Sequence, residues 1–157
     1  MQVAERDTHA IMDAAMELGV RLTTLDLESD ERVVPLRRNL GVSSFGFNLL
    51  LLRPGQRGRI HRHERQEEAY VVLEGTLTLV VEDEALDLPR GQVAAVGPEV
   101  RRQLVNRSRE RCAVLAVGGA EPHQGRDGRA FRSWEDMEGA TPQEIPLPED
   151  LPASELE

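Results

Sequence analysis

Residues 55–75 read GQRGRIHRHERQEEAYVVLEG and bring two histidines and a glutamate into one short region. His61 and His63 are separated by one residue, so on a β-strand both imidazoles point to the same side, about 6–7 Å apart along the chain. Glu68 opens the apolar run AYVVL, and a chain reversal through residues 64–67 would return its carboxylate beside the imidazoles. Two imidazole nitrogens and a carboxylate suit a divalent transition metal. The stretch therefore predicts a metal site between two paired strands.

The spacing of the whole stretch is glycine, five residues, HxH, four residues, glutamate, six residues and glycine. This pattern resembles the first motif of the cupin superfamily without a mismatch. The resemblance implies an all-β fold, the double-stranded β-helix or jelly-roll barrel, with Gly75 in a hairpin turn. It also implies that His61, His63 and Glu68 are ligands of Fe, Mn, Ni or Zn. An isolated HxH would more simply be a pair of surface or structural histidines, but the longer match favours ligands.

A second cupin motif, about fifteen residues downstream, normally carries glycine, proline, glycine, a fourth ligand histidine and asparagine. Its outer members, Gly91 and Asn106, stand at the expected separation, but Gly97, Glu99 and Arg102 take the places of the proline, the second glycine and the histidine. Arginine stays protonated and cannot ligate a metal. Its charge would repel a cation and would pair well with the glutamate of the first motif. The resemblance therefore implies the fold more strongly than it implies the metal.

Alternation along the strands identifies candidate substrate-binding residues. If the first strand is continuous, Arg59 shares the side of His61, and on the next strand Tyr70 shares the side of Glu68. Arg59 and Arg102 are candidates to bind a carboxylate or phosphate through the guanidinium fork. Tyr70 and Arg102 are the candidate catalytic or substrate-orienting residues. Alternatively, Arg59 is a solvated surface residue and Tyr70 is a core aromatic whose hydroxyl has a partner.

Length and composition indicate one modest domain with a separate tail. The apolar content of 39% is ordinary for a globular protein, and the net charge is −9, of which residues 121–157 carry −7. A body near neutrality has no electrostatic footprint for nucleic acid or an anionic membrane. No apolar run approaches the length of a membrane span, and the N-terminus lacks a basic start followed by an apolar stretch. We therefore expect a cytoplasmic protein.

Two residue types limit the possible chemistry. All 19 basic residues are arginine, which excludes a lysine Schiff base or a lysine general base. Cys112 is the single cysteine, so it cannot form an internal disulfide. It opens the apolar run CAVLAV, where a buried structural thiol is a better interpretation than a nucleophile.

Three segments are predicted along the chain. In residues 1–20, the apolar spacing predicts a short amphipathic helix over Thr8–Leu18, with Asp7 or Thr8 as N-cap and Gly19 as C-cap. Residues 21–120 contain short apolar runs between turn signals, as in an all-β sandwich or barrel: LTTLDL, FGFNLLLL, AYVVLE, TLTLVV, LDL, VAAV and CAVLAV. In residues 121–157, Phe131 and Trp134 are expected in a helical turn. The proline-rich acidic end is expected to be extended or disordered and to bury little apolar surface.

Two classes of function are consistent with these residues. In the first, the protein is a metal-dependent cupin enzyme that acts on a small, anionic organic molecule, as a dioxygenase or an isomerase does. In the second, it is a metal-free binding or sensing module in which Arg102 replaces the fourth ligand. No segment resembles a DNA-binding domain. Small single-domain cupins are commonly homodimers, and the exposed edges of an open β-sandwich need cover, so a homodimer is expected.

Overall fold

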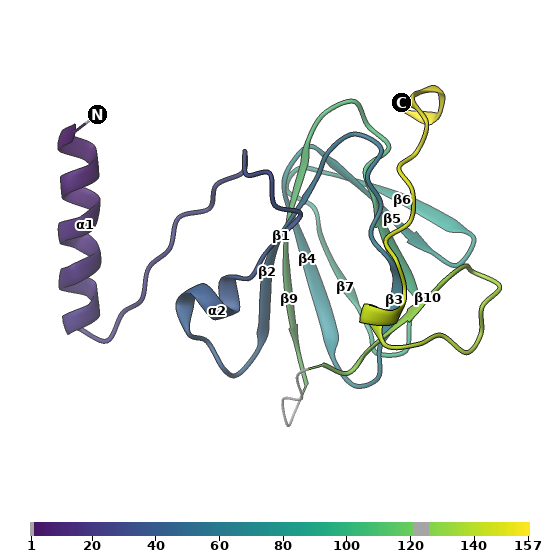
Figure 1. The fold of residues 1–157 in the computed structure, drawn as a ribbon, viewed down its shortest axis with the longest axis horizontal. Coiled ribbons are helices and arrows are strands. Elements are labelled where there is room, and N and C mark those ends of the chain that lie inside the picture. The colour runs from purple at the N-terminus through teal and green to yellow at the C-terminus, as the bar shows by residue number, and fades with distance from the viewer. Residues whose placement is uncertain (1, 121–125) are drawn as a thin grey trace.

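A computed structural model describes residues 2–120 and 126–157, and most of its regular structure is β-strand (Figure 1). The strands are β1 Val33–Val34, β2 Gly46–Leu52, β3 Ile60–His63, β4 Glu67–Glu74, β5 Thr76–Val81, β6 Glu84–Pro89, β7 Val93–Val96, β8 Arg102–Val105, β9 Cys112–Gly119 and β10 Gly128–Phe131. The helical segments are α1 Gln2–Glu17, α2 Leu36–Leu40 and the 3-10 turns η1 Pro142–Glu144 and η2 Ala153–Glu155.

The strands form two five-stranded antiparallel sheets. The first sheet has the order β1-β2-β9-β4-β7 and the second has the order β10-β3-β8-β5-β6. The longest pairing joins β2 to β9 over seven residue pairs, from Gly46 opposite Gly118 to Leu52 opposite Cys112. This architecture confirms the predicted all-β double-stranded β-helix with a short N-terminal helix.

Side chains of alternate residues on both sheets meet in one core. Leu77 and Leu79 of β5 face Tyr70 and Val72 of β4, and all four are buried. Each buried side chain of this kind contributes about 1.5–3 kcal/mol to folding. The remaining core members are Leu52, Val96, Leu104, Cys112, Val114 and Ala116. The buried structural position expected for Cys112 is confirmed.

The outer face of the first sheet is apolar as well. Part of it is covered by α2, whose buried Leu36 packs on Leu49 and Leu51. The remainder, which we term the apolar sheet face, consists of small and β-branched residues on β4, β7 and β9 that are half-buried or exposed: Ala69, Val71, Val93, Ala95 and Val117. Figure 1 shows α1 standing apart from the two sheets, so this helix does not cover the face.

Two turns explain sequence features of the motifs. Gly75 joins β4 to β5 with φ +72°, and a Cβ at this position would lie 2.1 Å from the carbonyl oxygen of Arg111. Only glycine fits there, as the predicted hairpin turn requires. Glu99, which replaces a motif glycine, also has a positive φ of 66°. The backbone therefore keeps the conformation that favours glycine although the residue has changed.

Three predictions about individual elements are wrong. The N-terminal helix begins at Gln2 rather than at Thr8, because residues 2–7 contain neither glycine nor proline to stop it. Its predicted end is confirmed, since Gly19 has φ +77° and Val20 N donates to Ala15 O. The run LTTLDL is not a strand in the structure.

The predicted helical turn at Phe131 and Trp134 is also wrong, because Gly128–Phe131 form strand β10 on the edge of β3. Trp134 lies in a turn after this strand. The aromatic side chains instead flank Arg101, whose guanidinium lies 5.2 Å from the centre of the Phe131 ring and 5.6 Å from that of Trp134. Among the described residues, no helix is long and apolar enough to cross a membrane.

The proline-rich end is extended, as predicted, but it packs against the barrel rather than leaving it (Figure 1). Ile145 is only 3% exposed, which contradicts the expectation that this end buries little apolar surface. Leu151 N donates to Gly55 O at 2.7 Å, and the Arg57 guanidinium donates to the carbonyl oxygen of Glu149. Because prolines prevent a regular strand, these separate contacts attach the tail to the protein.

Candidate metal centre

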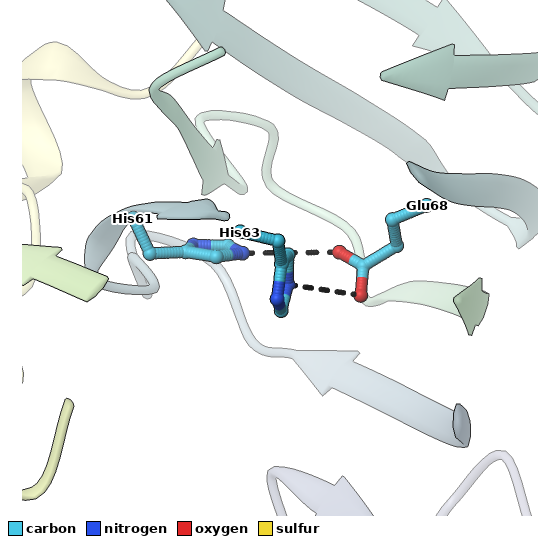
Figure 2. A group of neighbouring side chains, drawn as sticks. All are labelled: His61, His63 and Glu68. Carbon is cyan, nitrogen blue, oxygen red and sulfur yellow. Dashed lines mark ion pairs between the residues drawn. The ribbon is translucent and has the colours of Figure 1, made fainter. Parts of the chain in front are cut away.

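The three predicted ligands lie together inside the barrel (Figure 2). His61 and His63 extend from β3 and Glu68 extends from β4. The Nε2 atoms of His61 and His63 lie 3.8 Å and 3.5 Å from the two carboxylate oxygens of Glu68. One ligand atom from each residue can be chosen so that all lie within 4.8 Å of one another. This is a separation that one metal ion can bridge.

The other ring nitrogens of both histidines have partners. His61 Nδ1 lies 3.1 Å from the carbonyl oxygen of Arg59, and His63 Nδ1 lies 2.9 Å from Asp127 Oδ1. A carbonyl oxygen only accepts, so His61 Nδ1 carries the proton, and in the neutral ring Nε2 keeps its lone pair. Metal-binding histidines in proteins are oriented in this way, by a carbonyl or carboxylate on the second nitrogen.

Asp127 is a site residue that sequence reasoning missed. Its carboxylate accepts hydrogen bonds from the backbone amides of Arg65 and Gln66 at 2.8 Å and 2.9 Å, and from Gln66 Nε2 at 2.6 Å. Burial opposes ionisation, but these amide hydrogen bonds hold the pKa of Asp127 below its usual value. Asp127 lies far downstream of both motifs, in the loop before β10, and no spacing rule connects it to His63.

Arg102 and Tyr70 lie behind Glu68. Both are fully buried, and the Tyr70 hydroxyl donates to Glu68 Oε1. Arg102 donates through Nε to the Tyr70 hydroxyl at 3.0 Å, through Nη2 to Glu68 Oε1 at 3.3 Å and through Nη1 to Val100 O at 2.9 Å. Neither residue lines the cavities found among the described residues. Their contacts orient Glu68, and a direct contact of either residue with a substrate stays a prediction.

The protonation of these groups follows from their neighbours. Burial alone would raise the pKa of Glu68, but His61 and His63 hold it well below its usual range. Burial likewise would lower the pKa of His63, but contacts with Glu68 and Asp127 raise it. Burial and the Glu68 carboxylate raise the pKa of Tyr70 well above its ordinary value. Tyr70 is therefore a neutral donor and Glu68 is an anion.

The donor set fits a divalent transition metal. Two imidazole Nε2 atoms and one carboxylate are the ligand types that Fe, Mn, Ni and Zn accept. With neutral imidazoles, the centre contains two carboxylates, Glu68 and Asp127, and one guanidinium, Arg102, so its net charge is −1. Arg102 engages Oε1 of Glu68, while Oε2 is the oxygen nearer to His63. The cationic neighbour therefore weakens the attraction for a metal without reversing it.

Two of the described cavities have a candidate histidine ligand in their wall, and a third, of about 520 Å³, is bounded by Glu68. The arginine-lined cavity has a volume of about 580 Å³ and is bounded by Arg37, Arg38 and Arg126, with His63 and Glu68 in its wall. The apolar cavity has a volume of about 270 Å³, and its wall includes both histidines and several aliphatic side chains: Val33, Leu50, Leu52, Leu104 and Leu147. A ligand at the centre thus has a polar and an apolar direction in which to extend.

Arg59, a predicted anion-binding residue, lines the apolar cavity but is held by the tail. Its Nε donates to the carbonyl oxygen of Ile145 at 2.7 Å. Its backbone carbonyl is the acceptor for His61 Nδ1. Arg59 therefore has two structural contacts, one to the C-terminal segment and one to a candidate ligand.

Comparison with known proteins gives the same architecture. The cupin domain family matches residues 48–118, which contain the three candidate ligands and Arg102. No curated protein is significantly similar to the chain. Among solved structures, a cupin protein from Bacteroides fragilis is 19% identical over 68% of this chain and 86% of its own, with a TM-score of 0.56. At that identity the likeness shows the fold alone.

Two other solved structures are more similar in sequence. A sugar phosphate isomerase of the cupin superfamily from Silicibacter pomeroyi is 27% identical over 80% of this chain and 97% of its own, with a TM-score of 0.58. A provisionally named sugar phosphate isomerase from Acidithiobacillus ferrooxidans is 25% identical, with a TM-score of 0.52. That match covers 55% of this chain and 56% of the other protein, so the chain spans little more than half its length.

Proposed function

We propose that this chain, whose residues 48–118 match the cupin domain family, is a metal-dependent enzyme, of the isomerase type, that acts on a small organic molecule at the centre formed by His61, His63 and Glu68. One observation carries the proposal: both Nε2 atoms and the Glu68 carboxylate converge, while both Nδ1 atoms are already occupied by Arg59 O and Asp127. Orientation of both rings toward one point is what a metal centre requires. The isomerase type is supported by the names of two similar proteins.

A bound divalent metal would supply a Lewis acid that polarises a substrate oxygen. The residues of this chain position the ligands of the metal and exclude water from part of the site. Tyr70 and Arg102 hold Glu68 in place, and Asp127 holds His63. The aliphatic wall of the apolar cavity excludes water from one side of the substrate. In such a low-dielectric environment, fixed charges act more strongly on a reacting group than they do in water.

The experiment that tests this proposal is elemental analysis of purified wild type, His61→Ala, His63→Ala and Asp127→Asn. We expect about one equivalent of transition metal in wild type, close to none in the two alanine variants and reduced occupancy in Asp127→Asn. His9→Ala is the matched control, since His9 is an exposed histidine on α1. Equal metal content in all five proteins, at zero or otherwise, would exclude this metal centre.

A metal-free binding module is the second candidate, and the Arg102–Glu68 ion pair favours it. In that case Arg102 permanently occupies the carboxylate that a metal would need. The same elemental analysis separates the two, because a binding module predicts no metal above the His61→Ala background in wild type. Localisation in the cytoplasm stays a prediction.

We also propose that the protein is a homodimer that associates through the apolar sheet face. Val93, in the edge strand β7, is 63% exposed, and its cross-strand neighbour Val71 is apolar as well. None of the five residues that define the face is charged. A twofold contact centred on the Val71–Val93 pair, away from Glu67 at the start of β4, would therefore bury apolar side chains. The second sheet does not require a partner to cover an apolar surface, because its outer face carries polar residues such as Thr76, Arg62 and Gln103.

A further inference from the structure

The arginine-lined cavity is positively charged in a chain that is strongly acidic. The net charge of the protein is −9, yet the cavity wall contains three arginines and a single acid, Glu68. That acid is already paired with Arg102. The cavity therefore presents a net positive potential next to the candidate metal centre, where an anion is stabilised.

The three arginines come from segments far apart in the sequence. Arg37 and Arg38 belong to α2, which is fixed to the first sheet by the buried Leu36. Arg37 is held further by hydrogen bonds from Nε to Val42 O at 3.2 Å and from Nη2 to Ser43 O at 3.5 Å. Arg126 precedes Asp127, whose carboxylate is anchored by three hydrogen bonds. The fold thus brings positive charges from α2 and from the segment before β10 to the wall of one cavity.

The arginines predicted from the sequence lie outside this cavity. Arg102 is fully buried, and all its described partners belong to the protein: Val100, Tyr70 and Glu68. Arg59 lines the apolar cavity and donates its Nε to Ile145 O. The wall of the arginine-lined cavity has three arginines, and that of the apolar cavity has Arg32 and Arg59, both of which donate to backbone carbonyl oxygens. A volume of about 580 Å³ accommodates a small molecule that reaches from these side chains to His63 and Glu68.

We infer that Arg37, Arg38 and Arg126 form an oxyanion subsite that binds the phosphate or carboxylate group of the ligand whose other end lies at His63 and Glu68. Guanidinium groups bind both kinds of oxyanion through paired N–H donors. This inference rests on the proposed function for the placement of the ligand at the metal centre. The positive cavity itself does not depend on a metal.

Calorimetric titration of the full chain with inorganic phosphate tests the subsite. The titrations use chelator-treated protein and, separately, protein loaded with Mn(II). We expect Arg38→Gln and Arg126→Gln each to weaken phosphate binding about tenfold, and the double variant to bind none measurably. Arg38→Lys keeps the charge but loses the fork, so a smaller loss of about threefold is expected. Arg90→Gln, at an exposed arginine in the turn after β6, is the matched control and should bind as wild type does.

Unchanged phosphate affinity in the double variant would overturn the subsite. So would phosphate binding that appears only with Mn(II) and disappears in His61→Ala, because the phosphate would then bind the metal itself, and the proposed metal centre would stand. Conversely, phosphate binding that depends on the arginines in protein unable to bind Mn(II) would support the subsite and reject the metal centre. Malonate in a parallel titration separates a carboxylate preference from a phosphate preference. Melting curves confirm that each variant is folded.

Discussion

Arg102 gives Glu68 a permanent cationic neighbour at the position where the cupin pattern has a fourth ligand. The Arg102 guanidinium lies 3.3 Å from Glu68 Oε1, and the opposite residue on the neighbouring strand is His61. Two unit charges of the same sign about 5 Å apart repel by about 3 kcal/mol at an effective dielectric constant near 20. The identity of this one residue therefore affects how tightly the centre holds a cation.

We predict that Arg102→His tightens the binding of Mn(II) about tenfold, because it removes a fixed positive charge and adds a ligand. Titration calorimetry measures the change. Arg101→His is the control, since the Arg101 side chain pairs with Glu82 and contacts none of the candidate ligands. If Arg102→His and Arg101→His bind Mn(II) equally, the charge of Arg102 does not act on the metal. Loss of buried contacts should lower the melting temperature of Arg102→His.

Cys112 offers a second prediction for a single residue. Burial, followed by the nearby Glu74 carboxylate, raises the pKa of its thiol to about 12. Since the thiolate is the reactive form, native protein at pH 8 should be labelled by iodoacetamide far more slowly than unfolded protein. Mass spectrometry with and without denaturant measures the two rates. Rapid labelling of the native protein would show that β9 opens readily.

Among the elements, the C-terminal segment differs most from what its composition predicted. Composition suggested that the proline-rich acidic end buries little, and most of its residues are indeed exposed. One residue, Ile145, is its buried anchor, and its hydrogen bonds to the barrel use backbone atoms of the segment, with an ion pair from Glu157 to Arg107 in addition. Backbone hydrogen bonds are independent of residue identity, so the sequence could not reveal them.

We predict that removal of residues 142–157 destabilises the barrel. Ile145→Ala alone should lower the free energy of unfolding by about 2–5 kcal/mol, as the loss of a buried isoleucine does elsewhere. Denaturant unfolding measures this loss. Leu147→Ala, at a residue 43% exposed, is the matched control and should cost much less. A truncated protein as stable as the full chain would mean that the tail is not part of the folded unit.

The strands also differ in how easily they can be predicted from the sequence. The apolar runs of β2, β4, β5 and β9 predicted strands because each of them contributes buried residues to a sheet interior. By contrast, β8 and β10 read RQLV and GRAF, which are short and contain arginine. Their strand structure depends on pairing with β3 and β5. Such tertiary pairing overrides local propensity and is invisible to a pattern search.

For the whole molecule, the sequence located the barrel and the three candidate ligands, because motif spacing encodes a local hairpin. It did not locate Asp127, Arg37, Arg38 or Arg126, since these reach the centre from α2 and from the segment before β10. Their position depends on how distant segments pack. The same reason explains why the sequence suggested Arg59 and Arg102 as anion-binding residues, whereas our inference assigns the anion to Arg37, Arg38 and Arg126.

We predict that the purified protein is a dimer and that Val93→Glu converts it to a monomer. A carboxylate in the middle of an apolar contact would lose its hydration without gaining a partner. Light scattering after size exclusion measures the mass. Leu86→Glu, at a residue 50% exposed on the edge strand of the other sheet, should leave the dimer intact. A monomeric wild type, or a Val93→Glu variant that remains dimeric, would contradict the proposed interface.

The pairing of β2 with β9 has a consequence for how fast the protein folds. Leu52 lies opposite Cys112, so residues about sixty positions apart must meet before the central ladder of the first sheet can form. Closing such a loop costs chain entropy before any hydrogen bond of the ladder compensates for it. Chains dominated by distant contacts refold in milliseconds to seconds rather than in microseconds. Refolding should therefore be slow, and the local hairpin of β5 and β6 should form before β2 and β9 come together.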